Sequence, residues 1–191
     1  MYMKKLFLIA AMAATCFAAK AQDLKFAHVD FSELVQLMPE MDKAREVTDA
    51  ASAEAQETYE AMYQEFQTKY QAYQKNSATW SNTIRETKEK ELADIQTRLQ
   101  EFQQTVQQEL QAQQQQLIAP IYQKAQEVVN QLAKEGGYIY VVDKTSMLYI
   151  DDKLSTDLTP AARTALGIPE DRTLESLQAE LQAKAQANQA Q

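Results

Sequence analysis

The sequence is poor in the residues that build most catalytic and cofactor sites. Its 191 residues include one cysteine, one histidine and three glycines. The cysteine, Cys16, lies in the N-terminal leader, so the rest of the chain forms no disulfide and has no thiol nucleophile. Three scattered glycines build no phosphate-binding loop, and His28 has no second histidine or cysteine with which to share a metal. These absences argue against an enzyme, a nucleotide-binding protein and a metalloprotein, and we expect no cofactor.

Long apolar runs are also missing, except at the N-terminus. Lys4 and Lys5 precede an apolar run over residues 6–19, which an A-x-A cleavage motif follows. This pattern is typical of a secretory signal peptide and is too short for a membrane anchor. Cys16 raises the alternative of a lipoprotein, but its flanking residues fit a lipidation box poorly. We therefore expect residues 1–21 to be cleaved and the mature protein to lie outside the cytoplasm.

Positive charge is scarce in the mature chain. Without the three lysines of the leader, 16 basic residues face 27 acidic ones, which gives a formal charge of −11. Such a chain repels phosphate backbones, so we expect no nucleic-acid partner. The charge is uneven: residues 40–68 carry −6, whereas residues 69–98 carry +2.

Two stretches of the chain have large apolar residues at alternating spacings of three and four. They are Tyr59, Tyr63, Phe66, Tyr70 and Tyr73 in the first stretch and Leu92, Ile95, Leu99, Phe102 and Val106 in the second. Each is a heptad seam, and the two spacings mirror each other. The sequence therefore predicts an antiparallel coiled-coil hairpin over residues 40–135, with its tip near 81–83. Arms of about 40 residues would be about 60 Å long, so the hairpin is a protruding limb.

The same register extends toward the root of the limb. Ala55 falls opposite Leu110, and small facing large should let the arms stay close. At the tip, Thr83 and Glu86 have the spacing of a capping box that begins the second arm. Pro120 should kink that arm because it removes one helical hydrogen bond. We expect the aromatic residues of the seam to be core rather than a binding strip.

The remaining residues predict a small body divided by the limb. Residues 22–39 read as a strand and a short helix capped by Ser32, and residues 136–168 as a β-hairpin and a short helix. The hairpin strands are expected at 138–142 and 147–150. Residues 169–191 form a polar, Gln/Ala-rich tail that we expect to be frayed or disordered. The predicted class is α+β, mainly α.

Three short strands bury too little apolar surface to support such arms alone. We therefore expect several bodies to associate, which would also cover the strand edges. The apolar residues expected at this oligomer contact are Phe26, Val29, Phe31, Tyr138, Tyr140, Val142, Leu148 and Ile150.

Residues at the limb tip are candidates for contact with a client or with lipid. They are Lys75, Trp80, Arg85, Lys88 and Lys90. Two structural alternatives stand beside this interpretation. Trp80 falls on the heptad register and can plug the end of the coiled coil, which we favour. The bases can form an ordinary solvated helix surface.

Taken in order, these elements resemble the Skp/OmpH family of periplasmic chaperones. The similarity covers residues 24 to about 168 and lies in the first strand, Lys25–Asp30, the junction Leu37–Met41, the long hairpin, and the segments Gly137–Asp143 and Asp157–Pro160. It implies a jellyfish-shaped homotrimer whose strands form a small β-barrel and whose limbs enclose a cavity. The best-known members are strongly basic, whereas this chain is acidic.

The family resemblance also implies a function, which is ATP-independent holding of unfolded outer-membrane β-barrel proteins in the periplasm. The expected partners are therefore unfolded outer-membrane proteins, two further copies of the chain, and a membrane surface or lipid at the limb tips. The alternative is a structural or adaptor coiled-coil protein of the cell envelope that binds no unfolded client. Some positions of the seam lack a large apolar residue, which favours flexible limbs and hence the first hypothesis.

Overall fold

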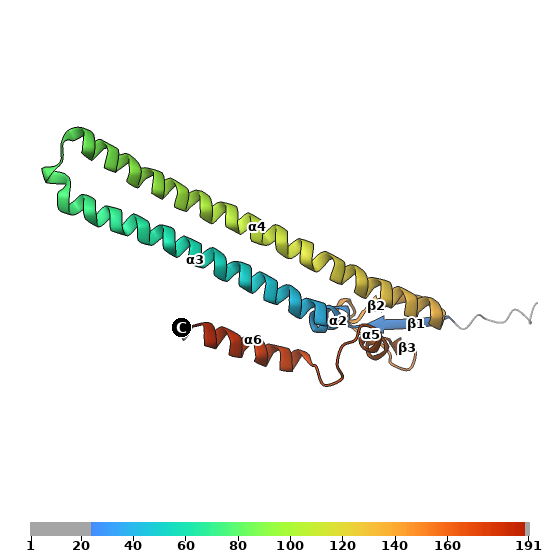
Figure 1. The fold of residues 1–191 in the computed structure, drawn as a ribbon. Coiled ribbons are helices and arrows are strands. Elements are labelled where there is room, and N and C mark those ends of the chain that lie inside the picture. The colour runs from blue at the N-terminus through green and yellow to red at the C-terminus, as the bar shows by residue number, and fades with distance from the viewer. Residues whose placement is uncertain (1–23, 190–191) are drawn as a thin grey trace, which may run out of the picture.

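The computed structural model describes residues 24–189, so the predicted signal peptide lies outside the described residues. A long helical hairpin projects from a small body of strands and short helices (Figure 1). The arms are α3, Pro39–Asn76, and α4, Asn82–Gly136, joined by a short 3-10 turn at Ser77–Thr79. The predicted fold class, a helical hairpin inserted into a small β body, is confirmed.

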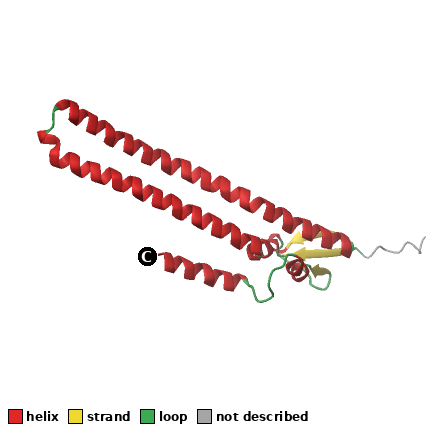
Figure 2. Cartoon of the chain, viewed as in Figure 1, coloured by secondary structure: helices red, strands yellow, loops and turns green. Residues whose placement is uncertain are grey.

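The body is a three-stranded sheet with β1 in the middle, in the order β2-β1-β3 (Figure 2). The strands are β1, Lys25–Val29, β2, Tyr138–Asp143, and β3, Ser155–Asp157. Both neighbours run parallel to β1. Parallel strands need a long crossover connection, and the whole limb is the crossover between β1 and β2.

The predicted β-hairpin at 136–168 is therefore wrong. Residues 147–150 form no strand, because Asp143 accepts a hydrogen bond from the Thr145 amide and begins a 3-10 turn at Lys144–Ser146. The chain then loops back so that β3 can enter beside β1 in the same direction. Pairing with the central strand, which is far away in sequence, decides the arrangement.

Both predicted helix caps are displaced by two residues. Asp30, not Ser32, caps α2, Phe31–Leu37, by accepting a hydrogen bond from the Glu33 amide at 2.9 Å. Ser81, not Thr83, caps α4 through the Ile84 amide. The predicted end of the second arm is confirmed, since Gly137 follows α4 with a φ of 69°, which glycine adopts without strain. The same helix continues through Pro120.

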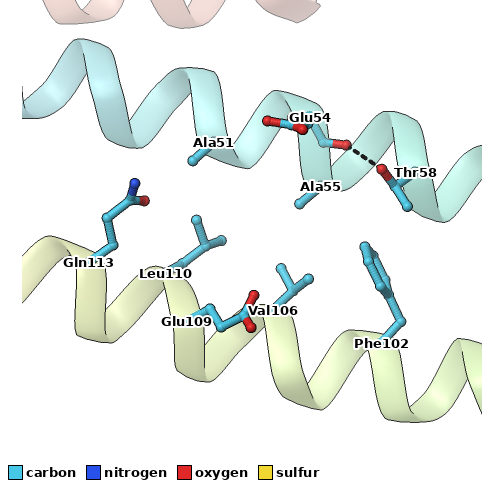
Figure 3. Close-up of a pocket in the computed structure, with 9 residues that line it drawn as sticks. All are labelled: Ala51, Glu54, Ala55, Thr58, Phe102, Val106, Glu109, Leu110 and Gln113. Atoms are coloured by element: carbon cyan, nitrogen blue, oxygen red, sulfur yellow. Dashed lines mark hydrogen bonds between the residues drawn. The ribbon is translucent and has the colours of Figure 1, made fainter.

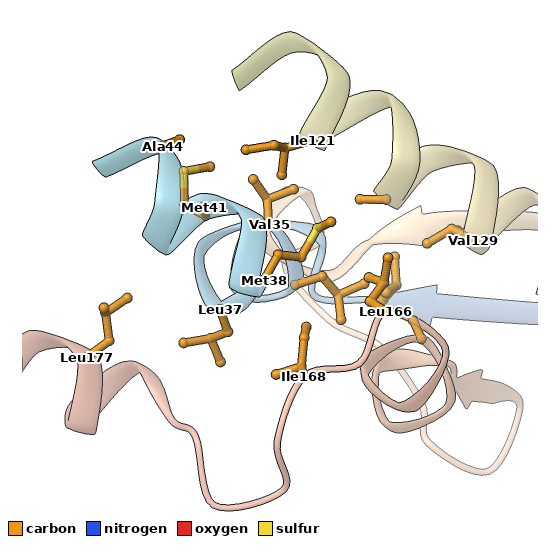
Figure 4. Close-up of a cluster of buried hydrophobic side chains, with 14 residues drawn as sticks. Val35, Leu37, Met38, Met41, Ala44, Ile121, Val129, Leu166, Ile168 and Leu177 are labelled. Carbon is orange, nitrogen blue, oxygen red and sulfur yellow. The ribbon is translucent and has the colours of Figure 1, made fainter. Parts of the chain in front are cut away.

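The core lies where the limb meets the body (Figure 4). It joins α2, the first turns of α3, the last third of α4 and α5, Thr159–Ala165. Leu34, Leu37 and Met38 are completely buried there. Val29 of β1 reaches the same cluster, so the limb root and the sheet share one core.

The described part of the C-terminal tail, up to residue 189, contains a docked helix, contrary to the sequence prediction. It forms α6, Leu174–Gln189, and Leu177 is only 4% exposed against the core cluster. Thr173 and Ser176 exchange hydrogen bonds between side chain and amide at the start of this helix. Such reciprocal capping favours a helix over a frayed end.

Candidate functional site

The seam between the two arms of the limb packs unevenly. Ile95 and Leu99 of α4 are buried, at 1% and 8% exposure. Tyr63 and Tyr70 of α3 are 43% and 45% exposed. The other predicted seam residues, which are Tyr59, Phe66, Tyr73, Leu92, Phe102 and Val106, are half-buried. The structure thus brings the two arms together along the predicted seam but closes it fully only near Ile95 and Leu99.

The aromatic residues of α3 stack in pairs along the helix. The rings of Tyr59 and Tyr63 lie 6.3 Å apart at 6°, and those of Phe66 and Tyr70 lie 5.8 Å apart at 11°. One ring of each pair is an exposed tyrosine, so the row is partly core and partly an accessible aromatic strip. An exposed aromatic face can contact many apolar side chains with little geometric demand.

Ion pairs beside the seam tie the arms together, and the sequence analysis missed them. Lys69 of α3 binds Glu91 of α4 and also lies 3.1 Å from Glu65. Glu91 accepts a second hydrogen bond from Lys88, at 2.8 Å. The hydrogen bonds from Lys69 and Lys88 lower the pKa of Glu91 to about 2. These residues flank the heptad positions, which is where coiled coils place charges that fix the pairing of helices.

A second ion pair joins the arms at the root. Lys124 of α4 binds Glu40 in the first turn of α3. The hydrogen bond from Lys124 lowers the pKa of Glu40 below its ordinary value, against a smaller opposing effect of burial. The limb is therefore tied at its base and near its tip.

Between these ties the arms leave a gap at Ala55. Figure 3 shows Phe102, Val106 and Leu110 of α4 pointing toward Ala51 and Ala55 of α3 without filling the space between them. One hollow at this level has a volume of about 420 Å³, and a second, also bounded by Ala55, has about 490 Å³. Small residues face large ones here, as the sequence shows, but the alanines are too short to fill the space between the arms.

At the tip, the predicted contact residues divide into two groups. Trp80 is half-buried and packs edge-on against Tyr73, with ring centroids 6.0 Å apart, as expected of a plug at the end of the coiled coil. Arg85 and Lys88 have partners within the chain, Asn82 and Glu91. Lys75 and Lys90 are exposed and take part in no ion pair within residues 24–189. Among the basic residues predicted for contact at the tip, these two lysines are therefore the ones without an ion-pair partner in the described part of the chain.

The residues predicted for an oligomer contact also separate. Val29 is buried in the chain's own core, and Phe31 packs against it and against Tyr122. Phe26, Tyr138, Val142 and Ile150 are half-buried. Tyr140 and Leu148 are exposed, Leu148 fully.

Exposed apolar residues that the sequence analysis did not select lie close to Tyr140 and Leu148 in the chain. They are Ile139 in β2 and Met147, Tyr149 and Leu154 in the loop before β3. We call these four residues, together with Tyr140 and Leu148, the body apolar surface. Exposed apolar residues of this kind are candidates for contact with another chain.

His28, the one histidine, is buried inside the body. It is 4% exposed, and its Nδ1 lies 2.9 Å from the Ser155 hydroxyl, across the β1–β3 pair. Burial alone would raise the pKa of Asp157, but hydrogen bonds from Thr159 hold it below its ordinary value. These contacts position β3. Residues 24–189 contain no group of three His, Cys, Asp or Glu residues that could hold a metal.

The fold is thus a long, incompletely closed helical limb on a small body. A family model described as outer membrane protein (OmpH-like) matches residues 25–166, and the chain belongs to this family. The family resemblance noted in the sequence is thus confirmed.

A solved structure shares the fold. It is a Caulobacter crescentus protein assigned as an outer membrane chaperone (OmpH-like), with a TM-score of 0.68 and 14% sequence identity. The match covers 75% of this chain and 83% of the other. No curated protein matches this chain. Within residues 24–189, no helix has the length and apolar character needed to cross a bilayer.

Proposed function

We propose that the protein is an ATP-independent holding chaperone of the periplasm. It binds unfolded outer-membrane β-barrel proteins and keeps them from aggregating until they reach the membrane. The observation that carries this proposal is the incompletely closed limb, in which Tyr63, Tyr70 and the gap at Ala55 leave apolar surface accessible along two long arms. Family membership supports the same class of function.

The physical demands on such a holder fit this limb. An unfolded β-barrel chain alternates apolar and polar residues and aggregates through its unpaired strand edges. A holder must cover it through many weak contacts, because a tight groove would prevent release. Stacked aromatic pairs and a partly open seam, with polar glutamine-rich faces around them, offer weak contacts of this kind.

The holding unit is a homotrimer in this proposal. The body apolar surface is exposed in the single chain, and β2 and β3 are both edge strands of the three-stranded sheet. Association of bodies would cover both features, while the limbs project together and face a common space. The free tip lysines, Lys75 and Lys90, are then placed to contact anionic lipid headgroups or acidic client segments.

Dilution of a urea-unfolded β-barrel protein into buffer tests this function. The protein is present without nucleotide, and light scattering follows client aggregation. Suppression at near one client per oligomer is the expected result. Unchanged aggregation at several-fold excess, across several such clients, would overturn the proposal and favour a structural or adaptor role in the envelope.

A further inference from the structure

The gap at Ala55 is open on two sides of the limb. Both hollows are bounded by the same four residues, which are Ala55, Phe102, Val106 and Leu110. The first hollow continues along Ala51, Glu54 and Glu109, and the second along neutral polar residues such as Gln103. We call these two hollows together the mid-limb slot.

The mid-limb slot is large enough for a bulky side chain. Its two hollows measure about 420 and 490 Å³. An apolar cavity of about 150 Å³ already accepts a benzene-sized group. Val106, Leu110 and the ring of Phe102 form one wall, and the methyl groups of Ala51 and Ala55 form the other (Figure 3). This lining favours an aromatic or long aliphatic side chain.

The charge around the slot selects among apolar partners. Glu54 and Glu109 line the first hollow, and no lysine or arginine does. Neither carboxylate takes part in an ion pair in the part of the chain that the structure describes. The α3 arm around them, over residues 40–68, carries a net charge of −6. A cation next to the apolar group would therefore be attracted.

We propose that the mid-limb slot binds a large apolar or aromatic side chain of an unfolded polypeptide where a lysine or arginine lies close to it in the client sequence. The side chain enters between Ala55 and Leu110, and the base reaches Glu54 or Glu109. This inference rests on the proposed holding function and deepens it, since it assigns a preferred segment to one part of the limb.

Charge complementarity favours this occupant over the others that an apolar slot could take. A limb from another copy would bring the same acidic α3 arm toward Glu54 and Glu109. An anionic lipid headgroup would meet the same carboxylates. Both are repelled, whereas a basic, apolar client segment is attracted at long range and then seated by its apolar group.

Two leucine substitutions provide a matched test. Ala55→Leu places a leucine side chain in the slot, whereas Ala53→Leu adds the same side chain on the exposed face of α3 two residues away. Fluorescence anisotropy measures binding of two labelled peptides, which share aromatic residues and differ only in lysine against glutamate beside them. We expect Ala55→Leu to weaken binding of the lysine peptide about tenfold, and Ala53→Leu to leave it unchanged.

The carboxylates are tested with the same peptides. The parent protein should bind the lysine peptide about fivefold more tightly than the glutamate peptide at low salt, as expected for partly exposed ion pairs. The double variant Glu54→Gln, Glu109→Gln should lose most of this preference and keep its affinity for the aromatic group. Equal affinity of the parent for both peptides, or unchanged binding by Ala55→Leu, would overturn the proposal.

Two further measurements separate the possible failures. Thermal unfolding of Ala55→Leu should show a melting temperature equal to or above that of the parent, because leucine fills empty space, so its weaker peptide binding does not reflect a damaged limb. If the parent suppresses client aggregation and Ala55→Leu binds the lysine peptide equally well, the slot assignment fails and the holding function stands. If the parent suppresses no aggregation, the function itself fails.

Discussion

Arg172 and Asp42 form an ion pair, with 2.7 Å between Nη2 and Oδ1, although they lie in the C-terminal segment and in the first turn of α3. The same arginine also pairs with Glu180 in α6. Next to these contacts, Leu177 is inserted against α2 and the limb root (Figure 4). The C-terminal helix is therefore a structural part of the body, anchored at the base of the limb.

The first prediction concerns this anchor. Leu177→Ala should lower the free energy of unfolding by about 2 kcal/mol, because it empties a buried site in the core. Leu181→Ala is the matched control on the same helix, and its cost should stay below about 0.5 kcal/mol because Leu181 is half exposed. Urea unfolding followed by circular dichroism measures both. Equal stability of the two variants would mean that α6 is not docked.

The second prediction concerns the closed part of the seam. Leu99→Asp should weaken the limb locally by about 3 kcal/mol, because it places a carboxylate at a buried position. Phe66→Asp, on the facing arm, should act in the same direction. Hydrogen exchange should accelerate over residues 59–106 and stay unchanged in the body. Tyr63→Asp is the control, since Tyr63 is already largely exposed.

The same variants test the division between limb and body. Because the seam lies far along the limb from the core cluster, both should keep the oligomeric state of the parent. Loss of the oligomer in Leu99→Asp or Phe66→Asp, measured by light scattering, would show that the limb is part of the assembly core.

The third prediction concerns the body apolar surface. Leu148 is fully exposed in the single chain, so Leu148→Glu should not disturb the fold of one body. Placed at a contact between copies, it would leave a carboxylate unpaired and dissociate the oligomer. Native mass spectrometry should then show monomers, whereas Leu181→Glu on α6 should remain oligomeric. An intact oligomer in Leu148→Glu would show that the contact between copies does not lie in this loop.

The fourth prediction concerns pH and the ion pairs beside the seam. Glu91 has an ordinary pKa of 4.5 when unpaired and a pKa of about 2 in the folded limb, because Lys69 and Lys88 donate hydrogen bonds to it. Since folding lowers this pKa, its contribution to stability is complete above pH 4.5 and is lost as the pH falls toward 2. Carbon-13 NMR of the Glu91 carboxylate should titrate near pH 2.

Glu91→Gln provides the control for this titration. It removes the charged pair at every pH, so the variant should lack the part of the acid sensitivity of the limb that comes from Glu91. A Glu91 carboxylate that titrates near 4.5 in the parent would contradict the cross-arm network.

The limb could be predicted from the sequence because the residue pattern that specifies it lies within each helix. Seam positions such as Phe66 and Leu99 repeat at heptad spacing, and Gly137 ends the second arm as expected. The degree of closure could not be predicted in the same way. Whether Ala55 and Leu110 touch depends on the separation of the whole helices, which the ion pairs at Lys69 and Glu40 help to set.

The order of strands in the sheet could not be predicted from the sequence for a related reason. Residues 147–150 have strand-like composition, but β1 takes its neighbours from β2 and from Ser155–Asp157. Strand pairing across such separations leaves no periodic pattern in one sequence. The tail does carry a helical pattern in its sequence, because Leu174, Leu177 and Leu181 have helical spacing and Thr173 precedes them as a cap.

The holding function is tested most directly by isolating the complex that it predicts. An unfolded β-barrel client is diluted from urea into buffer that contains the mature chain and no nucleotide. The soluble fraction is then examined by native mass spectrometry. The account predicts three copies of the chain with one client that remains unfolded by circular dichroism. Recovery of the protein alone in the soluble fraction, with the client in the pellet, would contradict it.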